Sequence, residues 1–170
     1  MSRFAECLPL ILRWEGGWAD HAEDPGGATN LGITIGTLSD WLGRPATKGD
    51  VRALTPATVA PIYEKNYWRA VGCDKLPPGV DYLVFDMAVL NGVRRTARWL
   101  QEAAGVVPVD RIIGPRTVAA VNAAGAIAII DKLTAKRTAF YKSLPTFKTF
   151  GRGWMNRVTD VWLKAKGMAQ

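Results

Sequence analysis

The stretch that decides the fold is Glu15 to Thr34, which reads EGGWADHAEDPGGATNLGIT. Before it, apolar residues recur at spacings of three and four from Phe4 to Leu12, so the sequence predicts an amphipathic helix from about Ser2 to Glu15, ended by two glycines. Turn-forming residues and a short β-branched run then predict a loop or small β-hairpin between Trp18 and Gly36. A helix followed by a turn-rich insertion therefore opens the sequence.

The rest of the sequence is predominantly helical. Its 170 residues, 48% hydrophobic and 22% charged, exclude disordered and fibrous classes and suit one domain or two small subdomains with a shared core. Capping and breaking residues together with apolar periodicity predict helices at about 37–42 with a cap at Thr37, 55–70 with a cap at Thr55, 80–90, 94–104, 115–123, 126–143 and 154–166. The fold class is therefore mainly α with one small hairpin region, and no apolar run approaches the roughly 20 residues of a membrane-spanning helix.

The net charge of +7 is distributed unevenly. Residues 1–93 hold 8 Lys and Arg against 11 Asp and Glu, a net −3, whereas residues 94–170 hold 14 against 4, a net +10. A field of this sign attracts polyanions, and the candidates are nucleic acid, acidic membrane surfaces and anionic cell-wall polymers. A basic face that only keeps the protein soluble is the alternative.

Glu15 is a charged residue on an apolar helix face. It lies 11 residues after Phe4, which at 3.6 residues per turn brings it to about 20° from Phe4. A carboxyl group partly removed from water holds its proton more readily, and the nearby negative end of the helix dipole acts in the same direction. Such a group is suited to protonate a glycosidic oxygen as the bond breaks. The alternative is a solvated glutamate paired with an arginine such as Arg13.

A second carboxylate is supplied by the loop. Asp24 stands nine residues after Glu15 in an Asp-Pro-Gly-Gly turn. Glycosidases commonly set an acid on one side of the scissile bond and a carboxylate on the other, as nucleophile or as base for a water, and Asp24 is a candidate for that partner. An ordinary turn-forming role for Asp24 remains open, and the other candidates for the partner or for positioning the water are Asp20, Glu23, Thr29 and Asn30.

These residues resemble the signature of glycoside hydrolase family 108, and the match is close over residues 15–17 and 24–34. Further family features follow at Tyr67 and Trp68, at 85–92 and at 99–101. Residues 110–117 are similar to a turn of the helical peptidoglycan-binding region that accompanies the catalytic half, with Arg111 where glycine is more usual. The resemblance covers nearly the whole chain.

Members of that family are N-acetylmuramidases, usually phage or prophage endolysins. The resemblance implies a lysozyme-like α+β fold, with residues 1–93 as the catalytic half and residues 94–170 as a peptidoglycan-binding half, packed together as one globular unit. It implies hydrolysis of the β-1,4 bond between N-acetylmuramic acid and N-acetylglucosamine, with Glu15 as the general acid.

The remaining site residues are expected around the same cleft. The spacing of Glu15, Asp24 and Thr29 is similar to the Glu, Asp, Thr arrangement of phage-type lysozymes, with the threonine one residue early. For Asp86 the alternative role is that of a buried acid satisfied by an arginine. Substrate contacts are predicted for Trp18, Asn30, Tyr67, Trp68, Asp86 and Asn91.

Other functional classes find less support in the sequence. Asp20, His21, Glu23 and Asp24 match no zinc or EF-hand spacing, so we expect neither a metal nor a cofactor. No nucleic-acid module is recognisable, and we expect no nucleic-acid partner. The rival functions are a lytic transglycosylase and a non-catalytic peptidoglycan-binding protein.

The expected setting follows from the amino-terminal sequence and the family. No signal peptide is recognised, and the two cysteines, Cys7 and Cys73, suit a reducing compartment. We expect a monomer made in the cytoplasm that reaches the wall in the periplasm after release, with a holin as the partner suggested by the family.

Overall fold

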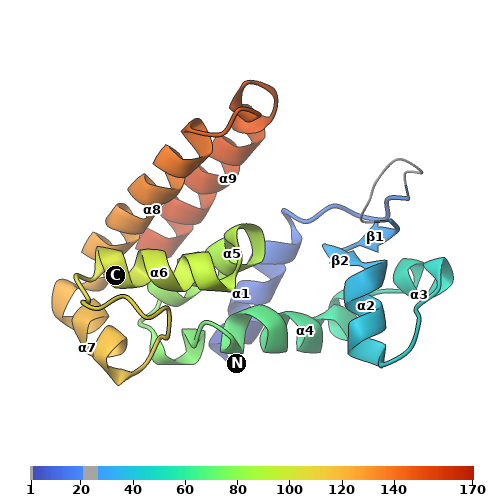
Figure 1. The fold of residues 1–170 in the computed structure, drawn as a ribbon, viewed down its shortest axis with the longest axis horizontal. Helices are drawn as coiled ribbons and strands as arrows, with labels where there is room; N and C mark the ends of the chain where they lie inside the picture. The colour runs from blue at the N-terminus through green and yellow to red at the C-terminus, as the bar shows by residue number, and fades with distance from the viewer. Residues whose placement is uncertain (1, 21–26) are drawn as a thin grey trace. The chain divides into compact units, whose positions relative to one another are not determined.

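The structure is a computed structural model that describes residues 2–20 and 27–170, and its backbone contacts divide it into two compact units, Met1–Asn66 and Tyr67–Gln170 (Figure 1). The division predicted from the sequence, after Val93, falls at the start of a helix inside the second unit. The observed division lies earlier in the chain because helix α5 (Val80–Asn91) packs against the helices that follow it and so belongs to the second unit.

The first unit consists of short helices around a two-stranded antiparallel hairpin. The hairpin pairs Thr29 with Thr34 and Asn30 with Ile33. Its elements are α1 (Arg3–Leu12), β1 (Thr29–Asn30), β2 (Ile33–Thr34), α2 (Ile35–Leu42), α3 (Lys48–Arg52) and α4 (Pro56–Tyr63). The predicted mainly α fold with a small hairpin after the first helix is confirmed.

Local capping explains where these helices begin. Ser2 caps α1, its hydroxyl accepting from the Ala5 N–H at 3.3 Å, and Thr55 caps α4 with proline at the first helical position, as predicted. The predicted cap at Thr37 is wrong: Thr34 caps α2 and accepts from the Thr37 N–H at 3.1 Å. Helix α3, which the sequence analysis missed, is only five residues long, too short to show a helical period.

The second unit is a bundle of longer helices. The helix predicted over 55–70 is in fact α4 followed by a π-helical segment, η1 (Glu64–Arg69), which crosses the boundary between the units. Helix α9 begins seven residues earlier and ends two residues later than predicted, whereas α5, α6, α7 and α8 agree with the prediction within one residue at each end. The remaining elements are η2 (Cys73–Lys75), α5, α6 (Val93–Ala103), α7 (Pro115–Ala124), α8 (Ala126–Lys142) and α9 (Phe147–Met168).

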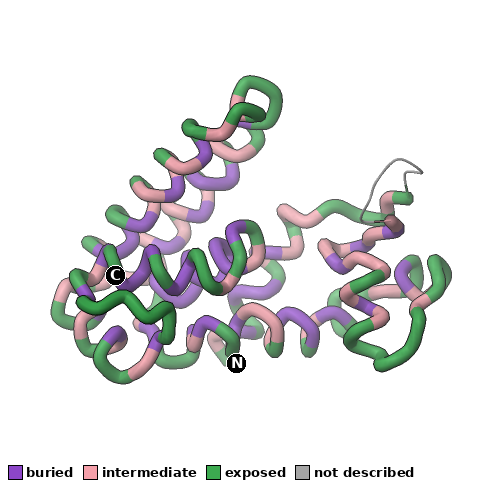
Figure 2. Tube along the Cα trace, in the orientation of Figure 1, coloured by how far each residue is buried: buried purple, intermediate pink, exposed green. Residues whose placement is uncertain are grey.

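Helix α5 forms the core of the second unit. It is buried from Val80 to Ala88 on all faces, as expected of a helix enclosed by neighbours, and it contacts η2, α6, α8 and α9 (Figure 2). Its one carboxylate in the middle of the buried run, Asp86, is fully buried and lies 2.7 Å from both Arg137 of α8 and Arg157 of α9. Opposite charge at this distance is what makes burial of the acid tolerable.

Among the described residues, no single helix is long and apolar enough to cross a membrane. Helices α7 and α8 pass such a test only as a pair, by length and composition, and they are bent by 102° at the break between them.

Candidate active site

Glu15 lies just beyond α1, in a tight turn that continues the helix direction. The helix ends at Leu12, three residues earlier than predicted, and the N–H groups of Trp14 and Glu15 then bond the carbonyls of Ile11 and Leu12 at 2.9 and 3.1 Å. These i to i+3 bonds form one further turn of chain after the last residue of α1. Glu15 is therefore half-buried although it is outside the α-helix.

The turn of the hairpin lies directly against the Glu15 side chain. Leu31 and Gly32 form the two-residue turn with φ angles of +49° and +73°, as a type I′ hairpin turn requires. A Cβ added to Gly32 would lie 2.9 Å from Glu15 Oε2 and 3.2 Å from Glu15 Cγ, and it would overlap the Tyr63 hydroxyl. The carboxylate thus occupies the space that the missing side chain of Gly32 leaves open.

Backbone and side-chain hydrogen bonds hold this turn in place from both sides. The Leu31 N–H donates to the Gly16 carbonyl at 3.0 Å, and the Tyr63 hydroxyl of α4 donates to the Leu31 carbonyl at 2.9 Å. Both backbone groups of Leu31 are therefore used, which stabilises a left-handed conformation that costs a leucine roughly 1–2 kcal/mol. The turn has little freedom to move away from Glu15.

Asn30 anchors the hairpin to α3 and the chain that follows it. Its side chain is 8% exposed, and its amide nitrogen lies 3.1, 3.3 and 3.4 Å from the carbonyl oxygens of Val51, Arg52 and Leu54. A buried amide committed to backbone carbonyls is a structural group. The predicted substrate contact of Asn30 is not supported by this geometry.

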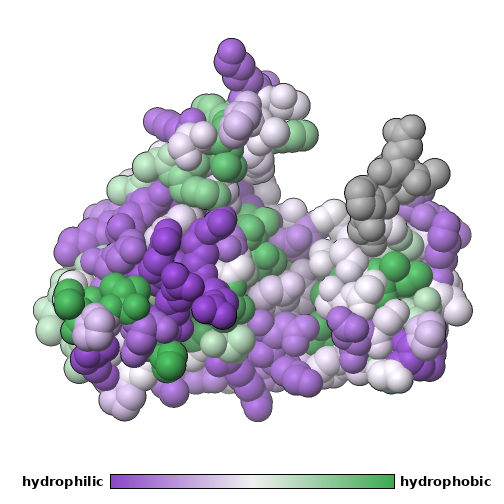
Figure 3. All heavy atoms as spheres, viewed as in Figure 1, coloured by the Kyte–Doolittle hydropathy of each residue, from purple (hydrophilic) through white to green (hydrophobic). Residues whose placement is uncertain are grey.

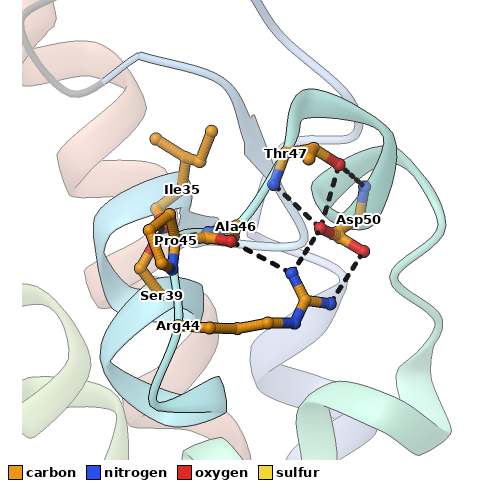
Figure 4. A network of polar contacts seen from close by, with 7 residues as sticks. All are labelled: Ile35, Ser39, Arg44, Pro45, Ala46, Thr47 and Asp50. Atoms are coloured by element: carbon orange, nitrogen blue, oxygen red, sulfur yellow. Dashed lines mark hydrogen bonds and ion pairs between the residues drawn. The ribbon is translucent and has the colours of Figure 1, made fainter.

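The loop before α3 is held by its own polar network (Figure 4). Arg44 donates to both carboxylate oxygens of Asp50, at 3.1 and 3.3 Å, while Thr47 and Asp50 form a reciprocal capping box. The Arg44 guanidinium, followed by the Thr47 N–H and hydroxyl, holds the pKa of Asp50 well below its usual value. The network fixes the start of the short helix whose C-terminal carbonyls receive Asn30.

Two further candidates are placed along the same hairpin. Ala19 pairs with Thr29 through both backbone bonds, at 2.8 and 2.9 Å, so the segment leading from Glu15 runs beside β1. Thr29 is half-buried, and its hydroxyl donates to the Gly27 carbonyl at 3.3 Å. Trp18 is 36% exposed, with the Arg52 guanidinium 5.7 Å from its ring centre. Thr29 and Trp18 remain predictions for the catalytic and saccharide-binding roles.

The loop acids are only partly described. Asp24, His21 and Glu23 lie outside the described residues. Asp20 is exposed and forms an ion pair with Lys48 at 2.9 Å. Over residues 2–20 and 27–170, no three His, Cys, Asp or Glu side chains come together as a metal site requires.

The other predicted substrate contacts belong to the second unit, where three of them are buried. Trp68 is fully buried, its indole N–H donating to Asp74 at 2.6 Å and its ring meeting Phe85 edge-on. Asn91 is 9% exposed and bonds the Tyr141 hydroxyl at 3.1 Å. Fully or nearly buried side chains offer a saccharide no surface, so the structure does not support these contacts.

Asp86 is also buried, whereas Tyr67 is not. The two arginines around Asp86 match the alternative stated for it, that of a buried acid, and its predicted substrate contact is unsupported. Tyr67 is half-buried in η1, and its role stays a prediction.

Sequence reasoning missed two groups that shape the Glu15 environment. Gly32 carries a recognisable signal, since a glycine at the second position of a two-residue turn between short β-branched strands is typical of a type I′ hairpin. Tyr63 carries none, because its contact with Leu31 joins residues 32 positions apart on different elements.

Comparisons with known proteins extend over both units. Residues 8–92 match the family model described as Glycosyl hydrolase 108, and residues 95–159 match one described as Predicted Peptidoglycan domain. A solved structure titled as SagA of Brucella abortus is 45% identical, with a TM-score of 0.87, over 98% of this chain and 95% of that one. A search of curated proteins gave no match.

Proposed function

The chain belongs to the glycosyl hydrolase 108 family, and we propose that it is an N-acetylmuramidase that cleaves the β-1,4 bond between N-acetylmuramic acid and N-acetylglucosamine, with Glu15 as the general acid. The family and the adjoining peptidoglycan domain support a peptidoglycan hydrolase. The observation that carries the finer proposal is the packing of the Glu15 carboxylate against Gly32.

In the proposed reaction, Glu15 donates its proton to the glycosidic oxygen as the bond to C1 of the muramic acid breaks. The leaving sugar takes that proton and departs as an alcohol, and a water oxygen bonds to C1 and loses its own proton to a base. A carboxyl group that is held in one orientation makes the proton transfer faster, because little reorganisation is needed in the transition state. The turn at Leu31 and Gly32, held by the Gly16 carbonyl and the Tyr63 hydroxyl, lies against the carboxylate and supports this proposal because it limits the space in which the carboxylate can move.

The partner of Glu15 is proposed from the loop and from β1. Asp24 is the leading candidate and Thr29 the second. If Asp24 is the nucleophile or base, Asp24→Asn should lower turnover about as far as loss of Glu15 does, and Thr29→Ala should lower it less. Equal and small effects from both substitutions would rule out these two residues as the partner.

The test is digestion of purified peptidoglycan followed by reduction and mass spectrometry of the fragments. The wild type should release muropeptides that end in reduced muramic acid. Glu15→Gln keeps the side-chain shape but removes the donated proton, so it should lower the rate at least about 100-fold. Glu6→Gln, on the exposed face of α1, removes the same charge and should retain the wild-type rate.

The rival activities give different products. Anhydromuramic ends would indicate a lytic transglycosylase that uses the same glutamate. Ends in reduced N-acetylglucosamine would indicate a glucosaminidase. Binding of the wild type to sacculi without release of any fragment would make the protein a non-catalytic wall binder and would refute the proposal.

A further inference from the structure

The second unit carries a pocket lined by four arginines. Arg94, Arg95 and Arg98 lie on one side of α6, and Arg111 lies in the loop between α6 and α7; together they enclose a volume of about 270 Å³. Figure 3 shows strongly hydrophilic side chains gathered over α6 on the face in view. A cavity lined by guanidinium groups is suited to an anion.

The loop that carries Arg111 is fixed to α6 by one buried side chain. The fully buried Gln101 accepts from the Arg111 N–H at 2.7 Å through Oε1. Its amide nitrogen lies 2.6 Å from Asp110 Oδ1, 3.1 Å from the Ile112 carbonyl and 3.1 Å from Thr117 Oγ1. The amide therefore uses both its donor and its acceptor groups to hold the backbone of the loop, which places Arg111 beside α6 before a ligand binds.

Arg111 itself adopts a backbone conformation that does not suit an arginine. Its φ is +66°, in the left-handed region that favours glycine. A residue that surrounding contacts hold in such a conformation is a candidate for a functional role. The Arg111 side chain is one of the four that line the pocket.

The positive charge of the pocket is only partly neutralised. Arg98 faces Glu102 at 3.5 Å, but Glu102 also binds Lys136 at 2.9 Å. Arg95 lies over the ring of Phe140 at 4.5 Å. Within the described part of the chain, the guanidinium groups of Arg94 and Arg111 form no ion pair. Arg94 and Arg95 also stand in the first turn of α6, where the helix dipole disfavours cations.

A second pocket shares Arg111 and adds apolar surface. It is also about 270 Å³, and its lining includes Lys75 and Arg69 together with Ala70, Ala97 and Ile112. Ile112 is 68% exposed and so presents its side chain to a ligand. Neighbouring sites for an anion and for small apolar groups match a short peptide that carries both carboxylates and methyl groups.

We propose that these two pockets bind the carboxylate-bearing peptide stems of peptidoglycan. The inference rests on the proposed function for its choice of substrate, and it assigns recognition of the peptide, rather than of the sugar chain, to α6 and the Arg111 loop. Two aromatic rings lie beside Arg95 of the pocket: the half-buried Phe140, with the guanidinium 4.5 Å from its ring centre, and Trp99, which is 5% exposed, with the guanidinium 5.9 Å from its ring centre. The Arg95 guanidinium lies over both rings and none of the four lining residues is aromatic, so among the described residues the pocket lining offers no open aromatic face on which a sugar ring would stack.

The test measures binding of soluble probes to the full-length protein by calorimetry, without any need for turnover. The probes are the free tetrapeptide stem, the same peptide with its carboxylates amidated, glycan strands freed of peptide, and a polyphosphate. The wild type should bind the free stem, and Arg94→Gln with Arg111→Gln should weaken that binding roughly tenfold or more, since each charged hydrogen bond contributes substantially. Arg152→Gln, which removes an exposed charge from α9 outside the pocket, is the matched control and should bind as the wild type does.

Arg111→Gly distinguishes a ligand-binding role from a structural one. Glycine relieves the left-handed strain, so the thermal midpoint should stay level or rise while binding of the stem falls. The proposal would be overturned if the wild type bound the amidated peptide as tightly as the free stem. It would also be overturned if the arginine substitutions weakened binding of naked glycan or polyphosphate but left binding of the stem unchanged. A protein that binds the stem through these arginines but releases no reducing ends would instead refute the proposed activity, so the two failures are distinguishable.

Discussion

Substitution of Gly32 by alanine tests the contact on which the active-site proposal depends. The new Cβ would lie 2.9 Å from Glu15 Oε2 and would overlap the Tyr63 hydroxyl, at a residue whose φ is +73°. The left-handed backbone costs alanine roughly 1–2 kcal/mol. The crowding adds roughly 1–3 kcal/mol if the neighbours must shift. We therefore expect a loss of unfolding free energy of about 2–5 kcal/mol.

Gly43→Ala is the matched control for the backbone cost. Gly43 also has a positive φ, +65°, but a Cβ built there meets nothing within 4 Å. Its substitution should cost only the conformational penalty of roughly 1–2 kcal/mol. The difference between the two variants in urea unfolding isolates the steric contribution of the Glu15 and Tyr63 contacts.

The same variant should also lose activity beyond its loss of folded protein. Because the carboxylate or the tyrosine must move, the rate of muropeptide release per folded molecule should fall by roughly tenfold or more. Gly43→Ala should keep the wild-type rate. If Gly32→Ala is no less stable than Gly43→Ala and cleaves at the wild-type rate, Glu15 does not lie against this turn and the reasoning fails.

Three other substitutions probe the supporting structure. Asp86→Ala leaves two buried arginines without their shared anion and should cost about 3–5 kcal/mol in urea unfolding. Asp160→Ala removes a half-buried member of an i, i+4 pair on α9 and should cost about 1 kcal/mol or less, so equal costs would contradict the assigned ion pairs. Arg44 holds the pKa of Asp50 below its unfolded value, so the stabilisation from this carboxylate is present above about pH 4 and is lost as pH falls further. The drop in thermal midpoint from pH 5 to pH 2 should therefore be smaller in Asp50→Asn than in the wild type. A drop of equal size in both proteins would refute this reasoning. Asn30→Ala removes the amide donor that joins β1 to the carbonyls of Val51, Arg52 and Leu54, and it should cost about 0.5–1.5 kcal/mol, with faster amide exchange in the hairpin. Protection equal to that of the wild type would show that the anchor is dispensable.

Much of the helical framework was predictable because its signals are local. Ser2 and Thr55 cap helices through hydroxyls that bond N–H groups three residues on, and proline or glycine marks several of the other helix boundaries. The misplaced cap at Thr37 shows the limit of such signals. Two threonines three residues apart both fit the cap pattern, and the strand pairing that ends at Thr34 is what selects between them.

The candidate site was predictable at Glu15 and less so around it. Trp68, Asp86 and Asn91 stand in motifs that resemble the family's, yet all three are buried within the second unit. A polar or aromatic residue in a motif can serve a fold as readily as a substrate, and the sequence alone does not distinguish the two. Burial distinguishes them, because a side chain enclosed by its neighbours has no surface left for a ligand.

Periodicity, caps and turn residues were enough to establish the fold class, most helix boundaries and the candidacy of Glu15, since each depends on residues a few positions apart. Counting charges along the sequence was enough to establish the charge asymmetry. Tertiary structure was needed to bring Tyr63 and Gly32 to Glu15, to enclose Asp86 between Arg137 and Arg157, and to set Arg111 beside the arginines of α6. Those contacts join distant segments whose approach depends on how the helices pack. No local pattern encodes that packing.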